Sequence, residues 1–215
     1  MTNQEMLRHI DHTLLKADAS WEGIKKLCEE AVAYRTASVC IPPSYVSRAQ
    51  EAYRDLPICT VIGFPLGYSV TSAKLREAEE ALAAGAAELD MVINIGDVKN
   101  RDFSRIQSEI ALLKKTAGSK ILKVIVETCW LDEKEKIRLC GIVRDAGADY
   151  IKTSTGFGTA GAVIEDILLF KKHIGTQVKI KAAGGIRTKA DVETFLAAGC
   201  DRIGASSAVA LLANG

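Results

Sequence analysis

Lysines occur inside three short apolar segments of this sequence, where charged side chains are uncommon. Lys123 lies in KILKVIVE, Lys152 in DYIKTS, and Lys181, with Lys179 two residues before it, in VKIKAAG. An ionised side chain in an apolar strand is costly unless it is paired, so a single such lysine is best interpreted as capping a strand or reaching solvent. Because three separate segments share the feature, they predict a common site instead.

The chemistry that suits such lysines is attack of an amine on a carbonyl group. A lysine with the ordinary pKa of about 10.4 is protonated at neutral pH and cannot attack, but burial and a second nearby cation both favour the neutral form. We predict that Lys152 is the nucleophile and that Lys181 is the second cation. The resulting Schiff base has an iminium nitrogen that accepts electrons, so a neighbouring carbon–carbon bond can break or form. Asp90, in the segment ELDMVI, is the predicted group that moves protons.

Eight apolar segments alternate with amphipathic helical segments along the chain, an order typical of parallel strands joined by helices. The predicted strands are residues 9–15, 36–41, 58–64, 88–93, 120–127, 149–154, 178–184 and 201–206. Gly85, Gly147 and Gly199 each end a helical segment, where glycine supplies a left-handed stop. The pattern predicts one α/β domain over residues 1–215, a single (β/α)8 TIM barrel with a short N-terminal helix, although such barrels usually have about 250 residues. A doubly wound open sheet is the alternative.

Side chains alternate along a strand, and a barrel carries its catalytic groups at the C-terminal ends of its strands. By this rule Lys179 and Lys181 share one face of a strand, and Lys123 and Glu127 share a face of another. Charged side chains that converge from several strands on one cavity predict a charge network with a function.

A glycine-rich segment follows Lys152. Residues 156–161, GFGTAG, match the dinucleotide fingerprint GxGxxG, which requires an acidic residue about 20 residues later at the end of the next strand. The next predicted strand ends in KAAG and has no such acid. We therefore expect these glycines to let the loop after Lys152 pass close to a substrate.

Two later loops are better candidates for binding an anion. Gly184 and Gly185 follow the seventh predicted strand, and residues 204–207, GASS, follow the eighth and open the last helix. Barrel enzymes commonly bind phosphate at these two loops through exposed backbone N–H groups. A glycine turn followed by a serine N-cap would explain the same residues without a ligand.

Composition excludes several other classes of function. The net charge of +1 gives no reason to expect nucleic acid or an anionic membrane as a partner, and no apolar run approaches the ~20 residues of a membrane span. The first residues, MTNQEMLRHIDH, lack the pattern of a signal peptide, and the six cysteines form no CxxC pair; together they predict reduced thiols in a cytoplasmic protein. His9 and His12 have no third ligand at a telling spacing, so no metal is expected.

A series of motifs along nearly the whole chain resembles the deoxyribose-phosphate aldolase family, whose members are class I, Schiff-base-forming aldolases. The motifs are IDHTLL (10–15), VCIPP (39–43), VIGFPLG (61–67), ELDMVIN (88–94), LKVIVET (122–128), IKTSTGF (151–157), KAAGGIR (181–187) and GASS (204–207). Each motif alone is weak, but the set in this order is specific. The resemblance implies a (β/α)8 barrel and, without a cofactor, reversible cleavage of 2-deoxy-D-ribose 5-phosphate to acetaldehyde and D-glyceraldehyde 3-phosphate.

The resemblance also implies a role for each matching residue. Lys152 is the Schiff-base nucleophile, Lys181 lowers its proton affinity, and Asp90 is the other acid–base group. The residues implied to bind or surround the substrate are Asp11, Thr13, Cys40, Lys123, Thr155, Gly156, Gly184, Gly185, Gly204, Ser206 and Ser207. Lys123, with Glu127, would order the lysine network, and the small side chain of Cys40 could equally belong to the core.

Two features depart from the family pattern. Some members have a lysine near the phosphate where this chain has Phe157, which would place more of the phosphate affinity on backbone groups or on Arg187. Some members also end in a tail with a terminal tyrosine that assists proton transfer, whereas residues 212–215 here are LANG.

Several points stay open. The chain could be another phosphosugar barrel enzyme, with a transaldolase-like or isomerase activity, or a non-catalytic barrel that binds phosphate. Apolar faces on the outer helices allow a homodimer or a higher homo-oligomer.

Overall fold

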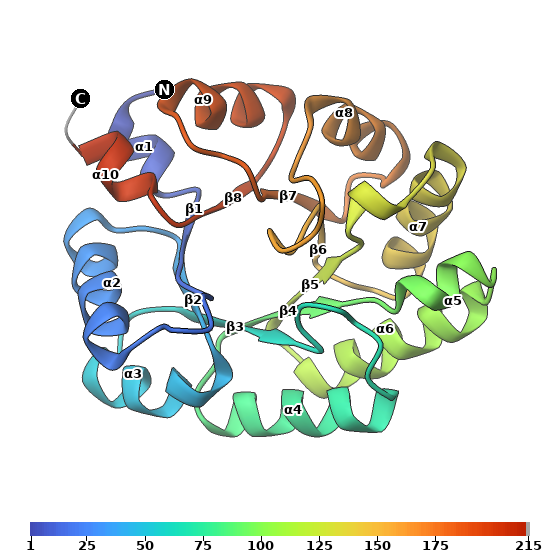
Figure 1. The fold of residues 1–215 in the computed structure, drawn as a ribbon, viewed down its shortest axis with the longest axis horizontal. Coiled ribbons are helices and arrows are strands. Elements are labelled where there is room, and N and C mark those ends of the chain that lie inside the picture. The colour runs from blue at the N-terminus through green and yellow to red at the C-terminus, as the bar shows by residue number, and fades with distance from the viewer. Residues whose placement is uncertain (214–215) are drawn as a thin grey trace.

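The computed structural model describes residues 1–213 as a closed barrel of eight parallel strands surrounded by helices (Figure 1). Each strand pairs with the next in the chain, and β1 also pairs with β8, which closes the barrel. The strands are β1 (Ile10–Thr13), β2 (Ser38–Ile41), β3 (Ile58–Ile62), β4 (Glu88–Val92), β5 (Ile121–Ile125), β6 (Tyr150–Lys152), β7 (Lys179–Ala183) and β8 (Arg202–Ala205). The predicted (β/α)8 barrel is confirmed, and the doubly wound alternative is wrong because an open sheet has two unpaired edges.

Helices cover the outside of the barrel all the way round (Figure 1). They are α1 (Asn3–Leu7), α2 (Trp21–Tyr34), α3 (Val46–Ala52), α4 (Thr71–Ala83), α5 (Ile95–Lys99), α6 (Phe103–Ala117), α7 (Glu133–Asp145), α8 (Ile164–His173), α9 (Lys189–Ala198) and α10 (Ala208–Ala213), with 3-10 turns at Pro43–Tyr45 and Thr128–Trp130. The short N-terminal helix that we predicted is α1. It lies beside α10, where Asn3 Nδ2 donates a hydrogen bond of 2.9 Å to Leu212 O, so the two ends of the described chain meet.

The two faces of the barrel sheet differ in chemistry. The outward strand positions carry buried apolar side chains, such as Leu89, Met91 and Val124, and these pack with the helices in one continuous core. The inward positions include Asp90 and Lys123, neither of which is exposed to solvent. Burial of apolar surface between strands and helices is therefore the main source of stability, and it allows the interior to be polar.

Glycines end the helices where the sequence predicted it. Gly85, Gly147 and Gly199 have φ values of 103°, 79° and 110°, in the left-handed region that favours glycine. Each stands just before a strand, so the chain turns from helix into sheet within two or three residues.

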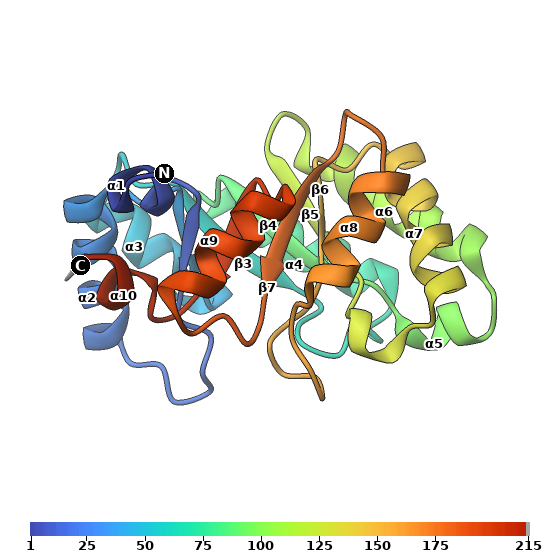
Figure 2. The ribbon, with the colours of Figure 1, turned by 90° about the horizontal axis from the view of Figure 1, so that it is seen from above.

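The strands end earlier than the apolar segments suggested. β5 ends at Ile125 and β6 at Lys152, so the last residues of the predicted segments 120–127 and 149–154 belong to loops. The loops after β1, in blue, and after β6, in orange, extend from the same side of the barrel (Figure 2). This side is the C-terminal end of the strands, where barrel enzymes place their active sites.

The structure gives no sign of a membrane-spanning segment within the part of the chain that it describes. No helix in residues 1–213 combines the length and the apolar composition that crossing a bilayer requires.

A buried ion pair joins α4 to α6. Lys74 is fully buried, and its Nζ lies 2.8 Å from Glu109 Oε2 and donates a hydrogen bond of 2.9 Å to Val92 O, at the end of β4. Thr71 Oγ1 donates to the other Glu109 oxygen at 3.0 Å. The pair therefore anchors two helices to the C-terminal end of a strand.

We predict that Lys74→Met lowers the free energy of unfolding by about 3–5 kcal/mol, because it leaves the Glu109 carboxylate buried without its cation. Urea denaturation of the purified variant measures the change. Lys115→Met on the exposed face of α6 is the matched control and should stay within about 0.5 kcal/mol of the parent protein. A Lys74→Met protein as stable as the control would show that the pair is not a structural anchor.

Candidate active site

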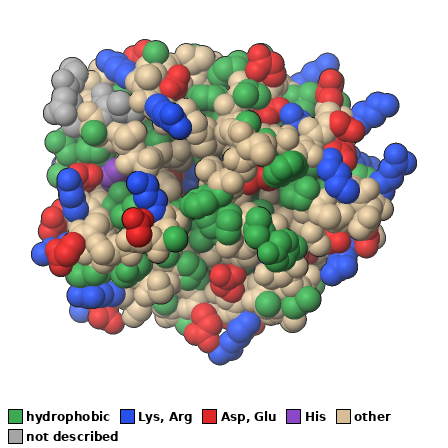
Figure 3. Space-filling model, viewed as in Figure 1, with side chains coloured by type: hydrophobic (Ala, Val, Ile, Leu, Met, Phe, Trp, Pro, Cys, Tyr) green, Lys and Arg blue, Asp and Glu red, His purple; other side chains and the backbone are tan. Residues whose placement is uncertain are grey.

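A cavity of about 450 Å³ opens at the C-terminal end of the barrel. Its walls are the loops that follow β1, β6, β7 and β8, and Lys152 is part of its lining. Figure 3 looks onto this face down the barrel axis and shows hydrophobic side chains gathered near its centre. One exposed hydrophobic residue at the cavity is Phe157, 54% exposed, whose ring packs edge-to-face on Phe64 with centroids 5.3 Å apart.

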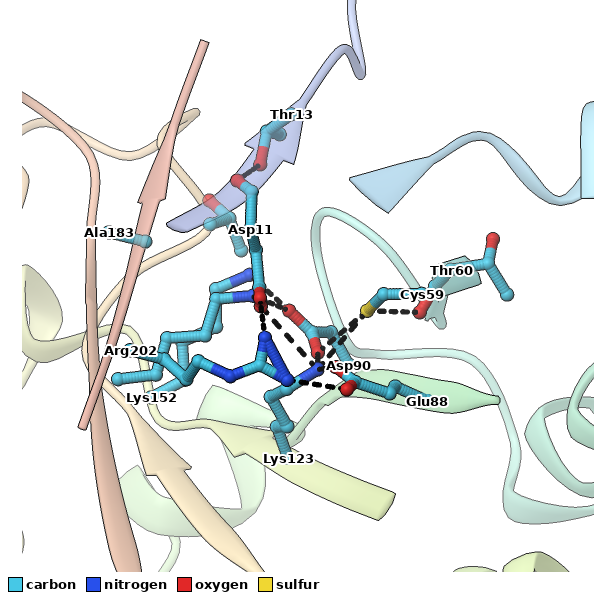
Figure 4. Close-up of polar contacts among 12 residues, drawn as sticks. Asp11, Thr13, Cys59, Thr60, Glu88, Asp90, Lys123, Lys152, Ala183 and Arg202 are labelled. Atoms are coloured by element: carbon cyan, nitrogen blue, oxygen red, sulfur yellow. Dashed lines mark hydrogen bonds and ion pairs between the residues drawn. The ribbon is translucent and has the colours of Figure 1, made fainter. Parts of the chain in front are cut away.

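Asp90 is the centre of the charged interior (Figure 4). Its Oδ2 accepts hydrogen bonds of 2.7 Å from both Lys152 Nζ and Lys181 Nζ, so the two amino groups are close neighbours. Its Oδ1 accepts hydrogen bonds from Lys123 Nζ at 2.9 Å and from the Cys59 thiol at 3.1 Å. One carboxylate thus joins the three lysines that the sequence placed in three separate strands.

Strand register brings these residues together. Asp90 on β4 is level with Lys123 on β5, and Lys152 on β6 is level with Lys181 on β7. In adjacent parallel strands, residues at the same level point to the same face. The sequence singled out the lysines of three strands, and the register decides which inward-facing residues they meet.

A further set of buried ion pairs surrounds the lysines that contact Asp90. Arg202 contacts Asp11 with Nη1 and lies 2.5 Å from Glu88 Oε1 with Nη2, while Lys123 Nζ lies 2.5 Å from Glu88 Oε2. Asp11 also accepts a hydrogen bond from Lys181. Every one of these side chains is buried, so each charge depends on its partners rather than on water.

The network determines the charge state of its members. Burial alone raises the pKa of the Asp90 carboxyl, but the three lysines around it outweigh this effect and hold the pKa well below its ordinary value. Burial alone lowers the pKa of Lys181, but Asp11 and Asp90 outweigh it and raise that pKa above the ordinary value. At neutral pH Asp90 is therefore a carboxylate and Lys181 an ammonium, which makes Lys181 a fixed positive charge beside Lys152.

The predicted site residues fall into two layers. Those on the cavity wall are Thr13, Lys152, Thr155, Gly156, Gly184, Gly185, Gly204, Ser206 and Ser207. Those beneath it are Asp11, Cys40, Asp90, Lys123 and Lys181, all with 0% exposure. Direct substrate contact by Asp11, Cys40 or Lys123 stays a prediction, because in this structure the three side chains do not line the cavity.

The prediction that Glu127 orders the lysines with Lys123 is wrong. β5 ends at Ile125, and Glu127 has a φ of 53°, so the alternation of the strand does not reach it. Its carboxylate instead accepts a hydrogen bond from Thr155 N at 3.1 Å. The carboxylates that do contact Lys123 are those of Glu88, Asp90 and Asp11.

Sequence reasoning missed Glu88, Arg202 and Cys59 as members of the network. Glu88 stands two residues before Asp90, so the i, i+2 rule could have found it. Arg202 is the register partner of Lys181, and Cys59 that of Glu88, on strands where no charged or thiol side chain had been predicted to face inward. For these two, the pairing follows from the closed sheet and leaves no local signal.

The glycines after Lys152 pack against protein. A Cβ atom at Gly161 would lie 2.2 Å from Gly184 O, and one at Gly158 would lie 2.8 Å from Cys129 Sγ. Both glycines therefore allow the β6–α8 loop to approach neighbouring loops, whereas the sequence had suggested an approach to substrate. Gly156 is the glycine of this group that lines the cavity.

One group of side chains has the composition of a metal site. The ligand atoms of Cys40, Cys59 and Asp90 all lie within 4.8 Å of one another, and thiolates and carboxylates are ligands that Zn²⁺ accepts. Lys123 Nζ, however, lies 3.3 Å from Cys59 Sγ and 2.9 Å from Asp90 Oδ1. This ammonium charge opposes a second cation at the same place, and the expectation of a metal-free reaction stays a prediction.

The departure that we expected at residues 212–215 falls partly outside the described residues, which end at residue 213.

Comparison with known proteins places the chain among aldolases. The model of the DeoC/LacD family aldolases matches residues 6–214. A deoxyribose-phosphate aldolase of Clostridium botulinum (strain Alaska E43 / Type E3) is 61% identical over 213 residues, which cover 99% of this chain and 96% of that protein. One of Clostridioides difficile (strain 630) is 56% identical over 98% of this chain and 97% of its own length.

Solved structures agree with this comparison. The structure described as QR15, an aldolase, has a TM-score of 0.94 at 36% identity and covers 97% of this chain and 95% of its own. The tetrameric deoxyribose phosphate aldolase of Aeropyrum pernix has a TM-score of 0.89 at 34% identity, with 99% and 91% covered. From its sequence, its fold and the lysine network that the fold assembles, this chain belongs to the DeoC/LacD family of aldolases.

Proposed function

We propose that this protein is a deoxyribose-phosphate aldolase, which reversibly cleaves 2-deoxy-D-ribose 5-phosphate to D-glyceraldehyde 3-phosphate and acetaldehyde. The observation that carries the proposal is the position of Lys152. Lys152 is part of the cavity lining, and its amino group shares the Asp90 carboxylate oxygen with the cationic Lys181. An amine, a proton-transfer group and a fixed positive charge are the parts that Schiff-base chemistry needs.

The balance of charges supports Lys152 as the residue that reacts as a free amine. The cationic side chains of the network are Lys123, Lys152, Lys181 and Arg202, and its carboxylates are Asp11, Glu88 and Asp90. The cations exceed the carboxylates by one, so one amine can lose its proton without leaving a carboxylate unpaired. If Lys152 loses its proton, Asp90 still has Lys123 and Lys181 as partners.

The reaction follows from this arrangement. The amine of Lys152 adds to the C1 aldehyde of the open-chain sugar, and loss of water leaves a protonated Schiff base. Asp90, directly or through water, takes the proton of the C3 hydroxyl. The C2–C3 bond then breaks and glyceraldehyde 3-phosphate leaves. Its electron pair forms a C1–C2 double bond while the C1–N double bond becomes single, which gives an enamine on the Lys152 nitrogen. Protonation of C2 and addition of water release acetaldehyde and restore Lys152.

The loops after β7 and β8 are the proposed place for the phosphate group. Gly184 and Gly185 have φ values of 84° and 77°, a backbone shape that presents N–H groups in a tight turn. Ser206 and Ser207 line the same cavity, and so does Arg187. We propose that these groups hold the phosphate and that Arg187 supplies positive charge where some family members have a lysine in place of Phe157.

The remaining features concern assembly and location. The Aeropyrum pernix relative is described as tetrameric, and we extend the proposal to a homo-oligomer of this chain. All six cysteines are free thiols, which supports a cytoplasmic enzyme. The proposed partners are small phosphosugars and aldehydes, with no nucleic acid or membrane.

We predict that borohydride reduction in the presence of 2-deoxyribose 5-phosphate traps a covalent adduct on Lys152, which peptide mass spectrometry locates. Lys152→Met should lose the adduct and at least about a thousandfold of the cleavage rate, because the nucleophile is gone. Lys179→Met is the matched control: Lys179 is exposed at the opposite end of β7, and its variant should trap and cleave as the parent does. Trapping on another lysine, or none at all, would refute the assignment.

Arg187→Met should raise the KM for 2-deoxyribose 5-phosphate about tenfold, since a charged hydrogen bond to phosphate is lost. The KM for unphosphorylated 2-deoxyribose should stay the same, because that substrate has no phosphate to hold. Coupled assays of glyceraldehyde formation, with the phosphorylated and the free aldehyde, measure the two values. If Arg187→Met raised both KM values equally, Arg187 would act on the cavity as a whole and not on the phosphate.

A further inference from the structure

Glu127 lies two residues after the end of β5 and has an unusual backbone conformation. It is 4% exposed, and its φ of 53° lies in the left-handed region that residues with side chains seldom adopt. Strain of this kind persists where surrounding contacts enforce it, and it is most common at functional sites. The contacts that hold Glu127 run to the loop that follows Lys152, so this conformation serves that loop.

The carboxylate of Glu127 accepts hydrogen bonds from both the backbone N–H and the hydroxyl of Thr155. Thr155 N lies 3.1 Å from Oε1 and 3.3 Å from Oε2, and the Thr155 hydroxyl donates to Oε2. Gly158 packs on the other side, where an added Cβ would come within 3.3 Å of Glu127 Cδ. Within residues 1–213, no lysine, arginine or histidine forms a salt bridge with this carboxylate. Its hydrogen-bonding capacity is directed to the loop instead.

With these contacts in place, the Thr155 hydroxyl can accept a further hydrogen bond but cannot donate one. Its one hydrogen points to Glu127, and one of its lone pairs accepts a hydrogen bond of 3.0 Å from Phe157 N. A hydroxyl has one hydrogen and two lone pairs, so what remains is one acceptor site. Thr155 lines the cavity, and a group bound to that site must therefore donate a hydrogen bond.

We propose that Glu127 is a positioning residue that turns Thr155 into an acceptor, so that Thr155 binds a hydroxyl of the sugar and rejects a phosphate or carbonyl oxygen. The inference rests on the proposed aldolase function and adds a selectivity that this function does not require. The N–H groups of Thr155 and Phe157 are already bonded within this part of the structure, so we expect the phosphate to take its donors from the adjacent turn at Gly184 and Gly185.

Glu127→Gln tests the proposal with a change of one atom. The amide can still accept from Thr155 N through its oxygen, but its NH2 group faces the Thr155 hydroxyl and donates to it. The Thr155 hydroxyl hydrogen then points into the cavity, so the substrate meets a hydrogen-bond donor where it met an acceptor before. The KM for 2-deoxyribose 5-phosphate should rise by at least about tenfold, as expected when a polar pair is mismatched. Borohydride trapping of acetaldehyde on Lys152 should proceed at the rate of the parent protein, because acetaldehyde has no hydroxyl.

A double-variant cycle distinguishes this role from a purely structural one. In a Thr155→Val background the hydroxyl is absent, and Glu127→Gln should change KM by less than about twofold. Glu133→Gln, an exposed glutamate in the first turn of α7, is the matched control and should leave KM unchanged. The proposal is overturned if Glu127→Gln leaves KM unchanged, if its effect persists undiminished without the Thr155 hydroxyl, or if acetaldehyde trapping is lost with it.

Binding measurements separate this inference from the proposed reaction. Calorimetry with 2-deoxyribose 5-phosphate in a Lys152→Met background compares the protein that retains Glu127 with the protein that also carries Glu127→Gln, without any turnover. A weakening of about tenfold is expected there too. If the parent protein traps no acetaldehyde, the aldolase proposal fails while this comparison still decides the role of Glu127.

Discussion

The rest of the site depends on one buried carboxylate with three lysines around it. Asp90 has no contact with solvent, and an isolated charge in such a position would be expensive. Its partners on β5, β6 and β7 offset that cost, and in return Asp90 holds three lysine amino groups within one small volume. Neither side of this arrangement is stable without the other, so the geometry of the site is as rigid as the barrel that carries it.

The barrel can hold such an interior because its stability comes from elsewhere. Apolar side chains on the outer face of the strands pack with the surrounding helices, while the inner face combines the charged residues with a small apolar cluster of Cys40, Cys59 and Val61. Burial of apolar surface between the two layers offsets the free energy needed to bury charges at the centre. A closed sheet also has no edge to protect, so its inner face is free for chemistry.

The two layers of the site have different roles. The lower layer sets the charge states of its own members through buried ion pairs. It contains Asp11, Asp90, Lys123 and Lys181, which Glu88 and Arg202 support. The upper layer consists of loops whose shape depends on glycines at close contacts and on the strained backbone of Glu127. Charge is therefore controlled on the strands, which are regular and rigid, and recognition is controlled on the loops, where hydrogen-bond polarity can be adjusted one residue at a time.

Local pattern was enough to predict the fold and to single out the lysines that the fold brings together. Short apolar segments separated by helical periods predict strands and helices wherever they occur. Lysines inside such segments stand out because a buried charge is costly unless it is paired. Gly85, Gly147 and Gly199 could be assigned to helix ends because a positive φ favours glycine whatever the surroundings. These inferences need only neighbours in the chain.

Tertiary structure alone decided which charges meet. Whether Lys123 pairs with Glu88 or with Glu127 depends on where β5 stops, and a strand ends where its partners in the sheet end, which no local pattern records. Arg202 joined the network because closing the barrel brings β8 beside β7 and β1. The sequence by itself determined the elements and the chemistry that they carry; register and closure, which are properties of all eight strands together, selected the partners of each charge.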